Sequence, residues 1–333
     1  MTLKKFDTEG LYKVYDIWPQ ISKESYESDL KPVDFKDIDH IVFAGMGGSG
    51  TIGDLFSAIL SKTGIHVNVV KGYLLPKTVD ENTLVIAISI SGNTRETLSI
   101  LESAQKSNCK KIAFSSGRKM ESYSEKNGIE YRKIPELHSP RASFSGYVYS
   151  ILKVLNYVIP IQKNDILESL EQLEKTSQKI NSNNLTETNP SLELAKWISG
   201  IPLIYYPFGL QAASIRFKNS MQENAKSHVM AEDVIEACHN GIVSWEKSSD
   251  VQPILLQGAD DYVKTKERWK ILKEFFEKKK IDYWEVSSVK GNILSKLITL
   301  IYHLDYTSIY LAVLNNTDPT PIDPIDFIKN RLQ

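Results

Sequence analysis

Short apolar runs alternate along this chain with segments whose apolar positions repeat at helical spacing. In the first half, five runs are predicted to be buried strands: Ile41–Ala44, His66–Val70, Leu84–Ile88, Lys111–Ser115 and Ile129–Ile134. Each of the first four is followed, before the next run, by a turn or a helical pattern. Because parallel strands are joined by crossover helices, this alternation predicts a doubly wound parallel sheet.

The second half of the chain repeats this architecture without repeating the sequence. Strands are predicted at Pro202–Tyr206, Ile254–Gln257 and Tyr283–Ser287, with helices at Gln211–Lys226, Asp261–Lys279 and Ile293–Leu314. The polar run at 181–184 is the best linker candidate. We therefore expect two α/β domains, 1–160 and 161–333, with flanking helices. One of these is predicted before the first strand, with Leu11, Val14, Tyr15 and Trp18 on one face.

Two turns rich in small and hydroxyl residues follow the first and third predicted strands. The first contains Gly45-Met46-Gly47-Gly48-Ser49-Gly50 and leads into a helix expected from about Thr51; the second is Ser89-Ile90-Ser91-Gly92-Asn93-Thr94. Helix N-termini offer unpaired backbone N–H groups and a favourable dipole to an anion. The turns therefore predict a phosphate site.

The glycine spacing also fits a dinucleotide-binding turn, which expects an acid at the end of the next strand. Here that strand runs into Lys71-Gly72-Tyr73, so this alternative is disfavoured. Tight turns without a ligand would explain the glycines but not the hydroxyl groups of Ser49, Ser89, Ser91 and Thr94. Binding of the phosphate monoester of a small molecule would explain both the glycines and the hydroxyl groups.

Polar residues that could take part in catalysis or binding cluster around three further positions. Arg141 directly precedes a predicted helix, where either a salt bridge or a phosphate contact would explain it. In the helix 211–226, Arg216, Asn219 and Glu223 share one face, which is either a solvated surface or part of a site. His239 lies in a polar turn, unlike the histidines that flank predicted strands.

Composition excludes several functional classes. Lys and Arg number 40 against 41 Asp and Glu, so no basic field predicts nucleic acid or an anionic membrane as a partner. No apolar stretch is judged long enough to span a bilayer, and the N-terminus lacks a signal-peptide core. Two cysteines are too few for a disulfide framework, and no histidine pair has metal-ligand spacing. We expect a cytoplasmic protein without a metal or cofactor.

The two turns resemble the sugar-isomerase (SIS) domain of phosphosugar-binding proteins. Further motifs extend the resemblance over nearly the whole chain, to the archaeal bifunctional phosphoglucose/phosphomannose isomerase family: Pro140-Arg141, Glu223-Asn224-Ala225-Lys226, His239-Asn240 and Asp318-Pro319-Thr320-Pro321. The chain departs from the family at Ile90 and at Ser220-Met221-Gln222, where an aromatic residue and a Glu-Leu-Asn run are usual. These departures bear on substrate preference.

The resemblance implies two SIS-type domains and an isomerase of glycolysis and gluconeogenesis. It would interconvert glucose 6-phosphate, and mannose 6-phosphate, with fructose 6-phosphate through a cis-enediol. By position, the sugar phosphate would be bound by Gly47, Gly48, Ser49, Ser89, Ser91 and Thr94.

The resemblance also assigns the chemical steps and the assembly. Arg141 would stabilise the intermediate, Glu223 would be the base, His239 would serve ring opening, and Lys329 matches a lysine of ring opening or substrate contact. The family further implies a homodimer with its active site at the interface, His239 reaching across from the other subunit. Two alternatives stay open: a non-catalytic phosphosugar-binding regulatory protein, and an aminosugar-phosphate isomerase.

Overall fold

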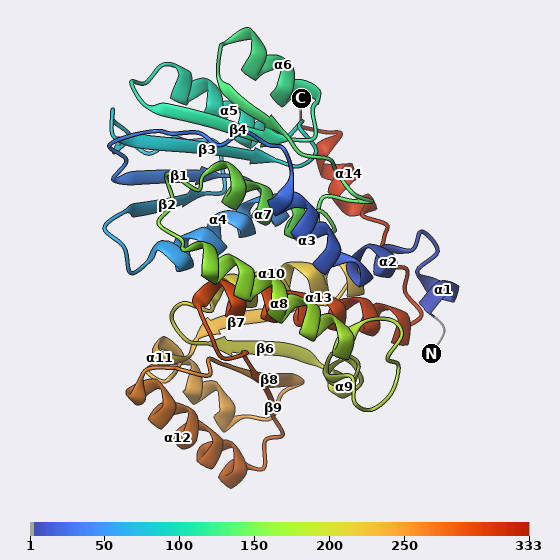
Figure 1. The fold of residues 1–333 in the computed structure, drawn as a ribbon. Coiled ribbons are helices and arrows are strands. Elements are labelled where there is room, and N and C mark those ends of the chain that lie inside the picture. Colours follow the sequence, from blue (N-terminus) through green and yellow to red (C-terminus); the bar gives the residue numbers. More distant parts are fainter. Residues whose placement is uncertain (1–2, 333) are drawn as a thin grey trace.

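Two parallel sheets form the framework of the molecule. The computed structural model describes residues 3–332, and Figure 1 shows the sheets in alternating layers with helices. The first sheet has the order β2-β1-β3-β4-β5, and the second has the order β7-β6-β8-β9. The strands are β1 (His40–Ala44), β2 (His66–Val70), β3 (Thr83–Ser89), β4 (Lys110–Ser115), β5 (Glu130–Lys133), β6 (Ile201–Tyr206), β7 (Met230–Asp233), β8 (Val251–Gln257) and β9 (Trp284–Ser287). The predicted α/β fold with two parallel sheets is confirmed.

Helices cover both faces of each sheet. Those of the first half are α1 (Leu3–Phe6), α2 (Leu11–Asp16), α3 (Trp18–Glu27), α4 (Gly47–Leu60), α5 (Arg95–Gln105), α6 (Arg118–Lys126) and α7 (Phe144–Val154). The second half contains α8 (Lys163–Ile180), α9 (Pro190–Trp197), α10 (Gln211–Ser220), α11 (Val234–Ala237), α12 (Val263–Lys279), α13 (Ile293–Leu314) and α14 (Asp323–Lys329), with a π-helix η1 (Met221–Ala225) and a 3₁₀ helix η2 (Gly241–Glu246).

Helix α13 lies between the two sheets and packs on α8, α9 and α10 (Figure 1). Contrary to the sequence-based expectation, it is long and apolar enough to cross a membrane by length and composition alone. However, 89% of the apolar stretch of this helix is buried inside the protein, as expected for a core helix. Its one carboxylate, Asp305, is fully buried.

The predicted N-terminal helical segment is divided into separate helices. The chain breaks at Ile17, between α2 and α3. Leu11, Tyr15 and Trp18 are nevertheless fully buried, because the break still turns all three toward the core. The indole Nε1 of Trp18 donates to the carbonyl of Ala142 at 2.8 Å, so this helical segment supports the loop that carries Arg141.

Strand β7 was missed in the sequence. Its four residues, Met230–Asp233, form an edge strand paired only with β6. Edge strands of this length carry too few alternating positions for a clear periodic signal. The strand places α11, and with it His239, beside the second sheet.

Candidate active site

The two predicted phosphate turns lie side by side. Strands β1 and β3 are paired in parallel, with Ala44 opposite Ala87, so their carboxyl ends meet at one edge of the sheet. Ile90 is one of the positions at which the chain departs from the family pattern. Its N–H donates to Ser49 Oγ at 3.4 Å. The turns are therefore joined to each other by the hydroxyl of one of the predicted residues.

Hydroxyl groups of the second turn are ordered by their own contacts. Ser89 Oγ donates to Thr94 Oγ1 at 2.9 Å and accepts from the Thr94 N–H at 3.3 Å. Ser91 is half-buried, and its hydroxyl makes no hydrogen bond within residues 3–332. Ser49, Ser89, Ser91 and Thr94 thus share one edge of the sheet, and Ser91 keeps a free hydroxyl.

The first turn needs its glycines for close approach. Helix α4 begins at Gly47, four residues before the predicted start. Gly47 itself has a positive φ of 53°, a conformation that glycine adopts without steric cost. A Cβ atom on Gly48 would lie 3.1 Å from Nη1 of Arg216. The backbone at Gly48 therefore lies close to the side chain of Arg216, from the second half of the chain, and near the backbone of Arg141.

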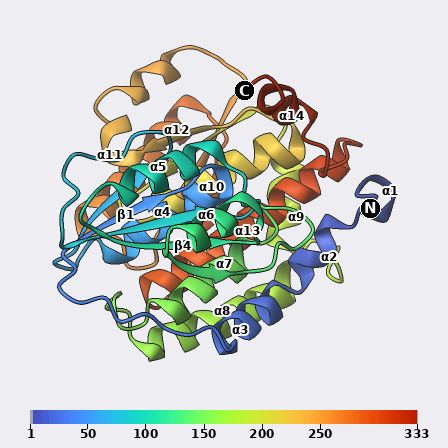
Figure 2. The ribbon, with the colours of Figure 1, turned by 90° about the horizontal axis from the view of Figure 1, so that it is seen from above.

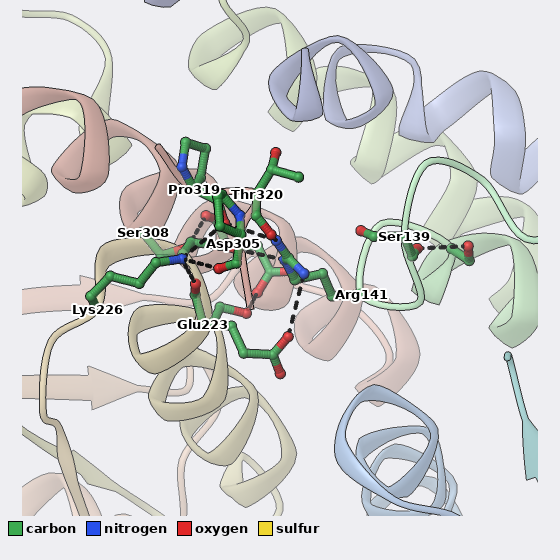
Figure 3. Close-up of polar contacts among 12 residues, drawn as sticks. Ser139, Arg141, Glu223, Lys226, Asp305, Ser308, Pro319 and Thr320 are labelled. Carbon is green, nitrogen blue, oxygen red and sulfur yellow. Dashed lines mark hydrogen bonds and ion pairs between the residues drawn. The ribbon is translucent and has the colours of Figure 1, made fainter. Parts of the chain in front are cut away.

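Arg141 is the centre of the polar cluster in Figure 3. Its side chain is 4% exposed. Nε donates to Asn224 Oδ1 at 2.7 Å, and Nη2 donates to the carbonyls of Pro319 at 2.8 Å and Thr320 at 2.9 Å. The remaining nitrogen, Nη1, lies 3.6 Å from Oε2 of Glu223. The structure therefore brings together Arg141 and Glu223, two of the predicted site residues.

Glu223 belongs to a π-helical turn, which corrects the expected continuous α-helix over 211–226. Helix α10 ends at Ser220, η1 covers the next five residues, and Lys226 has a left-handed φ of 57°. The wider turn changes the direction of the side chains that follow it. As a result Arg216 points to Asp305 while Glu223 points to Arg141, so they do not share a solvated face.

Arg216 and Asp305 form a buried ion pair beneath the site. Nη2 of Arg216 lies 2.7 Å from Oδ2 of Asp305 and also donates to the carbonyl of Arg141 at 2.7 Å. The hydroxyls of Tyr15 and Ser220 donate to the same carboxylate. Burial opposes the charge of Arg216, but the attraction and hydrogen bonds of Asp305, together with Tyr15 and Glu223, outweigh it, and the pKa of the guanidinium lies above its ordinary value. This network ties α10 and α13 to the Arg141 backbone.

Lys226 joins η1 to the segment before α14. Its Nζ donates to the carbonyls of Glu223 at 2.5 Å and Pro321 at 2.7 Å, and to that of Pro319 at 3.3 Å. Burial and, second, the positive charge of Arg141 lower the pKa of this lysine. The predicted 318–321 motif is thus held against the carboxylate-bearing turn by Lys226 and Arg141 together.

Two predicted residues lie apart from this cluster. His239 is exposed at the end of α11, which packs on β6 and β7 on the outer side of the second sheet (Figure 1). Lys329 ends α14, a helix with no buried residue at the edge of the molecule in Figure 2. Within residues 3–332 neither side chain forms a hydrogen bond or ion pair with Arg141 or Glu223. One chain therefore brings together only part of the predicted set.

Sequence reasoning gave no role to three residues that shape the site: Asn224, which it named only within a motif, Asp305 and Ser308. A single carboxylate inside the apolar helix 293–314 was a usable signal, because buried acids are normally paired. For metal binding, no cluster of three or more His, Cys, Asp or Glu side chains suited to an ion lies within residues 3–332.

Comparison with known proteins shows which class of domain the chain contains. Residues 34–151 match the SIS domain family, and residues 187–332 match the bacterial phospho-glucose isomerase C-terminal SIS domain. A solved structure of a hypothetical protein, TT0462 from Thermus thermophilus, has the same fold at 14% identity, with a TM-score of 0.72, covering 96% of this chain and 89% of the other. The molecule is thus built from two SIS domains.

Full-length relatives define the family. The chain is 32% identical to the bifunctional phosphoglucose/phosphomannose isomerase of Caldicellulosiruptor bescii, covering 97% of this chain and 96% of the relative. It is 31% identical to the protein of the same name from Aquifex aeolicus, over 98% and 99% of the two chains. This chain belongs to the bifunctional phosphoglucose/phosphomannose isomerase family.

Proposed function

We propose that this protein is an aldose–ketose isomerase that converts glucose 6-phosphate and mannose 6-phosphate to fructose 6-phosphate and back. The observation that carries the proposal is a partly exposed carboxylate, Glu223, facing the buried guanidinium of Arg141 at 3.6 Å. The Gly48 turn of the first domain adjoins the same cluster. Membership of the isomerase family supports the same reaction.

The phosphate binds at the two turns of the first domain. Hydroxyls of Ser49, Ser91 and Thr94 donate to its oxygens, together with backbone N–H groups of Gly47 and Gly48 at the start of α4. Ser89 joins this phosphate site by donating to Thr94 Oγ1, which leaves the Thr94 proton for the phosphate. Because the phosphate takes no part in the chemistry, its binding energy serves to orient the sugar carbons. The free hydroxyl of Ser91 supports this role.

Glu223 transfers the proton between the two carbons. Its carboxylate removes the proton from C2 of the open-chain aldose and returns it to C1 of the enediol(ate). Negative charge develops on the oxygens of this intermediate, and Nη1 of Arg141 offsets it. A single carboxylate that serves either C2 epimer accounts for the use of both aldoses. These steps use no cofactor.

Ring opening draws on a second copy of the chain for its histidine. We assign it to His239, with Lys329 as a further contact, each moving a proton on the ring oxygen or O1. The separation of His239 from Glu223 within one chain supports a homodimer in which the partner's histidine completes the site. The exposed apolar side chains of α14, Phe327 and Ile328, are in keeping with such a contact.

The domain limits and the compartment belong to the same proposal. Residues 1–160 form the phosphate-binding domain, and residues 161–333 form the domain that carries Glu223 and His239. The two cysteines, Cys109 and Cys238, are unpaired, in keeping with a cytoplasmic enzyme.

A coupled assay of fructose 6-phosphate formation from each aldose tests the function. We expect turnover with glucose 6-phosphate and with mannose 6-phosphate, and none with glucosamine 6-phosphate. Binding of all three without turnover would instead identify a regulatory phosphosugar-binding protein. Turnover of the aminosugar alone would favour the aminosugar-phosphate isomerase.

A further inference from the structure

The guanidinium of Arg141 is held almost entirely by neutral groups. Its Nε is bound by the amide of Asn224, and its Nη2 by two peptide carbonyls. Arg216, one layer deeper, is instead paired directly with a carboxylate at 2.7 Å. The two buried arginines thus differ in their carboxylate contacts: Arg216 is hydrogen-bonded to Asp305, whereas the carboxylate of Glu223 lies 3.6 Å from Arg141, beyond hydrogen-bond length.

Asn224 is itself fixed in one orientation. It is fully buried, and its Nδ2 donates to Ser308 Oγ at 2.9 Å. Ser308 Oγ in turn donates to the carbonyl of Asp305 at 2.6 Å, so Ser308 must accept from Asn224. This chain of bonds places the amide oxygen of Asn224, and not its nitrogen, against Arg141.

We infer that Asn224 is a positioning residue whose neutral amide orients Arg141 while leaving the guanidinium charge available to the reaction intermediate. A carboxylate at this place would also accept from Nε, but it would neutralise the charge in a site of low dielectric. The amide gives the same geometry without that loss. This inference rests on the proposed function, because it requires an anionic intermediate beside Arg141.

The test compares two inhibitors on the wild type and on Asn224→Asp. One is a hexonate 6-phosphate, whose C1 carboxylate carries a charge like that of the enediolate; the other is a hexitol 6-phosphate, which is neutral at C1. We expect Asn224→Asp to weaken the hexonate relative to the hexitol by about 10–100-fold, the range of one hydrogen bond to a charged group. The kcat should fall by a similar factor, with little change in KM.

Asn224→Ala serves as the variant without added charge. It removes the support of Arg141, so we expect a lower kcat at nearly unchanged KM, and a smaller change in the inhibitor ratio than in Asn224→Asp. This variant also decides the question if the aspartate variant does not fold, because an unchanged kcat would show that Asn224 does not position Arg141.

The outcomes separate this inference from the function on which it rests. An inactive wild type overturns the proposed function and the inference with it. An active wild type whose inhibitor ratio is the same in Asn224→Asp overturns the inference alone. A purely structural asparagine would weaken both inhibitors equally and leave their ratio unchanged.

Discussion

Oε2 of Glu223 lies 3.6 Å from Nη1 of Arg141, beyond hydrogen-bond length but within reach of an ion pair. The side chain of Glu223 is 25% exposed, whereas that of Arg141 is buried. An acid in direct bidentate contact with an arginine would be neutralised and blocked. Here the two groups face the same space, which suits a base and a stabilising cation acting on one substrate.

Because the hydroxyl of Ser91 makes no hydrogen bond within the described chain, its removal tests substrate binding without changing protein stability. Ser91→Ala removes no hydrogen bond within the described chain, whereas Ser89→Ala loses both contacts with Thr94. We expect both variants to raise KM by roughly 5–10-fold, from one lost phosphate contact of about 1 kcal/mol. Only Ser89→Ala should also lower the urea midpoint. An unchanged KM in Ser91→Ala would remove that serine from the phosphate site.

Gly92 shapes the second turn by its conformation and by its contact. It has a φ of 69°, and a Cβ atom there would overlap the carbonyl oxygen of Gly117. Gly209 has a φ of 95° with nothing within 4 Å of the same position, so it is the matched control. We expect Gly209→Ala to cost about 1–2 kcal/mol of stability and to leave KM unchanged. Gly92→Ala should cost more and raise KM; equal effects would contradict the clash.

The imidazole of His303 leads us to predict that the protein loses stability in mild acid. Burial lowers its pKa to about 4, and a hydrogen bond with the backbone of Pro190 offsets this only in part. Below the ordinary histidine pKa of about 6.5 the unfolded chain binds a proton that the folded chain refuses, so stability falls as the pH drops. Between pH 6.5 and 5 this loss is about 1.5 kcal/mol.

Urea unfolding of the wild type and of His303→Leu at pH 6.5 and pH 5 measures this contribution. The difference in free energy of unfolding between the two pH values should shrink by about 1.5 kcal/mol in the variant. The same change at the exposed His228 is the control and should leave the difference as it is. An equal pH dependence in wild type and His303→Leu would show that this histidine is not the cause.

Complementation tests the shared site. Glu223→Gln and His239→Asn chains, each inactive alone, are unfolded and refolded together. If each site takes its glutamate from one chain and its histidine from the other, half of the dimers are mixed and each has one intact site. Recovery should then approach about a quarter of wild-type activity. No recovery after confirmed mixing would place His239 in the same chain's site, or outside it.

Much of the architecture could be read from the sequence because the strands are nearly continuous apolar runs. Leu84–Ile88 is fully buried, and the parallel order of the first sheet follows from its crossovers. The two hydroxyl turns were found for the same reason, since parallel neighbours deliver their carboxyl ends to one edge. The pairing of Arg141 with Glu223 was available only through the family resemblance.

What could not be predicted depends on contacts between distant segments. The π-turn at η1 has no periodic signature, and it redirects Glu223 away from the face of Arg216. The support of Arg141 by Asn224 and the Pro319 carbonyl joins residues far apart in the chain. Such contacts depend on the packing of α10 and α13, which a local pattern does not encode.

Proton exchange at C2 tests the central claim, that Glu223 is the base, most directly. Glucose 6-phosphate is incubated in deuterated water with the wild type, with Glu223→Gln and with Ser91→Ala, and the C2 proton is followed by NMR. We predict fructose 6-phosphate and deuterium at C2 with the wild type, and the same exchange with Ser91→Ala at saturating substrate. Glu223→Gln should bind with a similar KM but exchange and turn over about 10²–10⁴-fold more slowly. Exchange at the wild-type rate in Glu223→Gln would contradict the account.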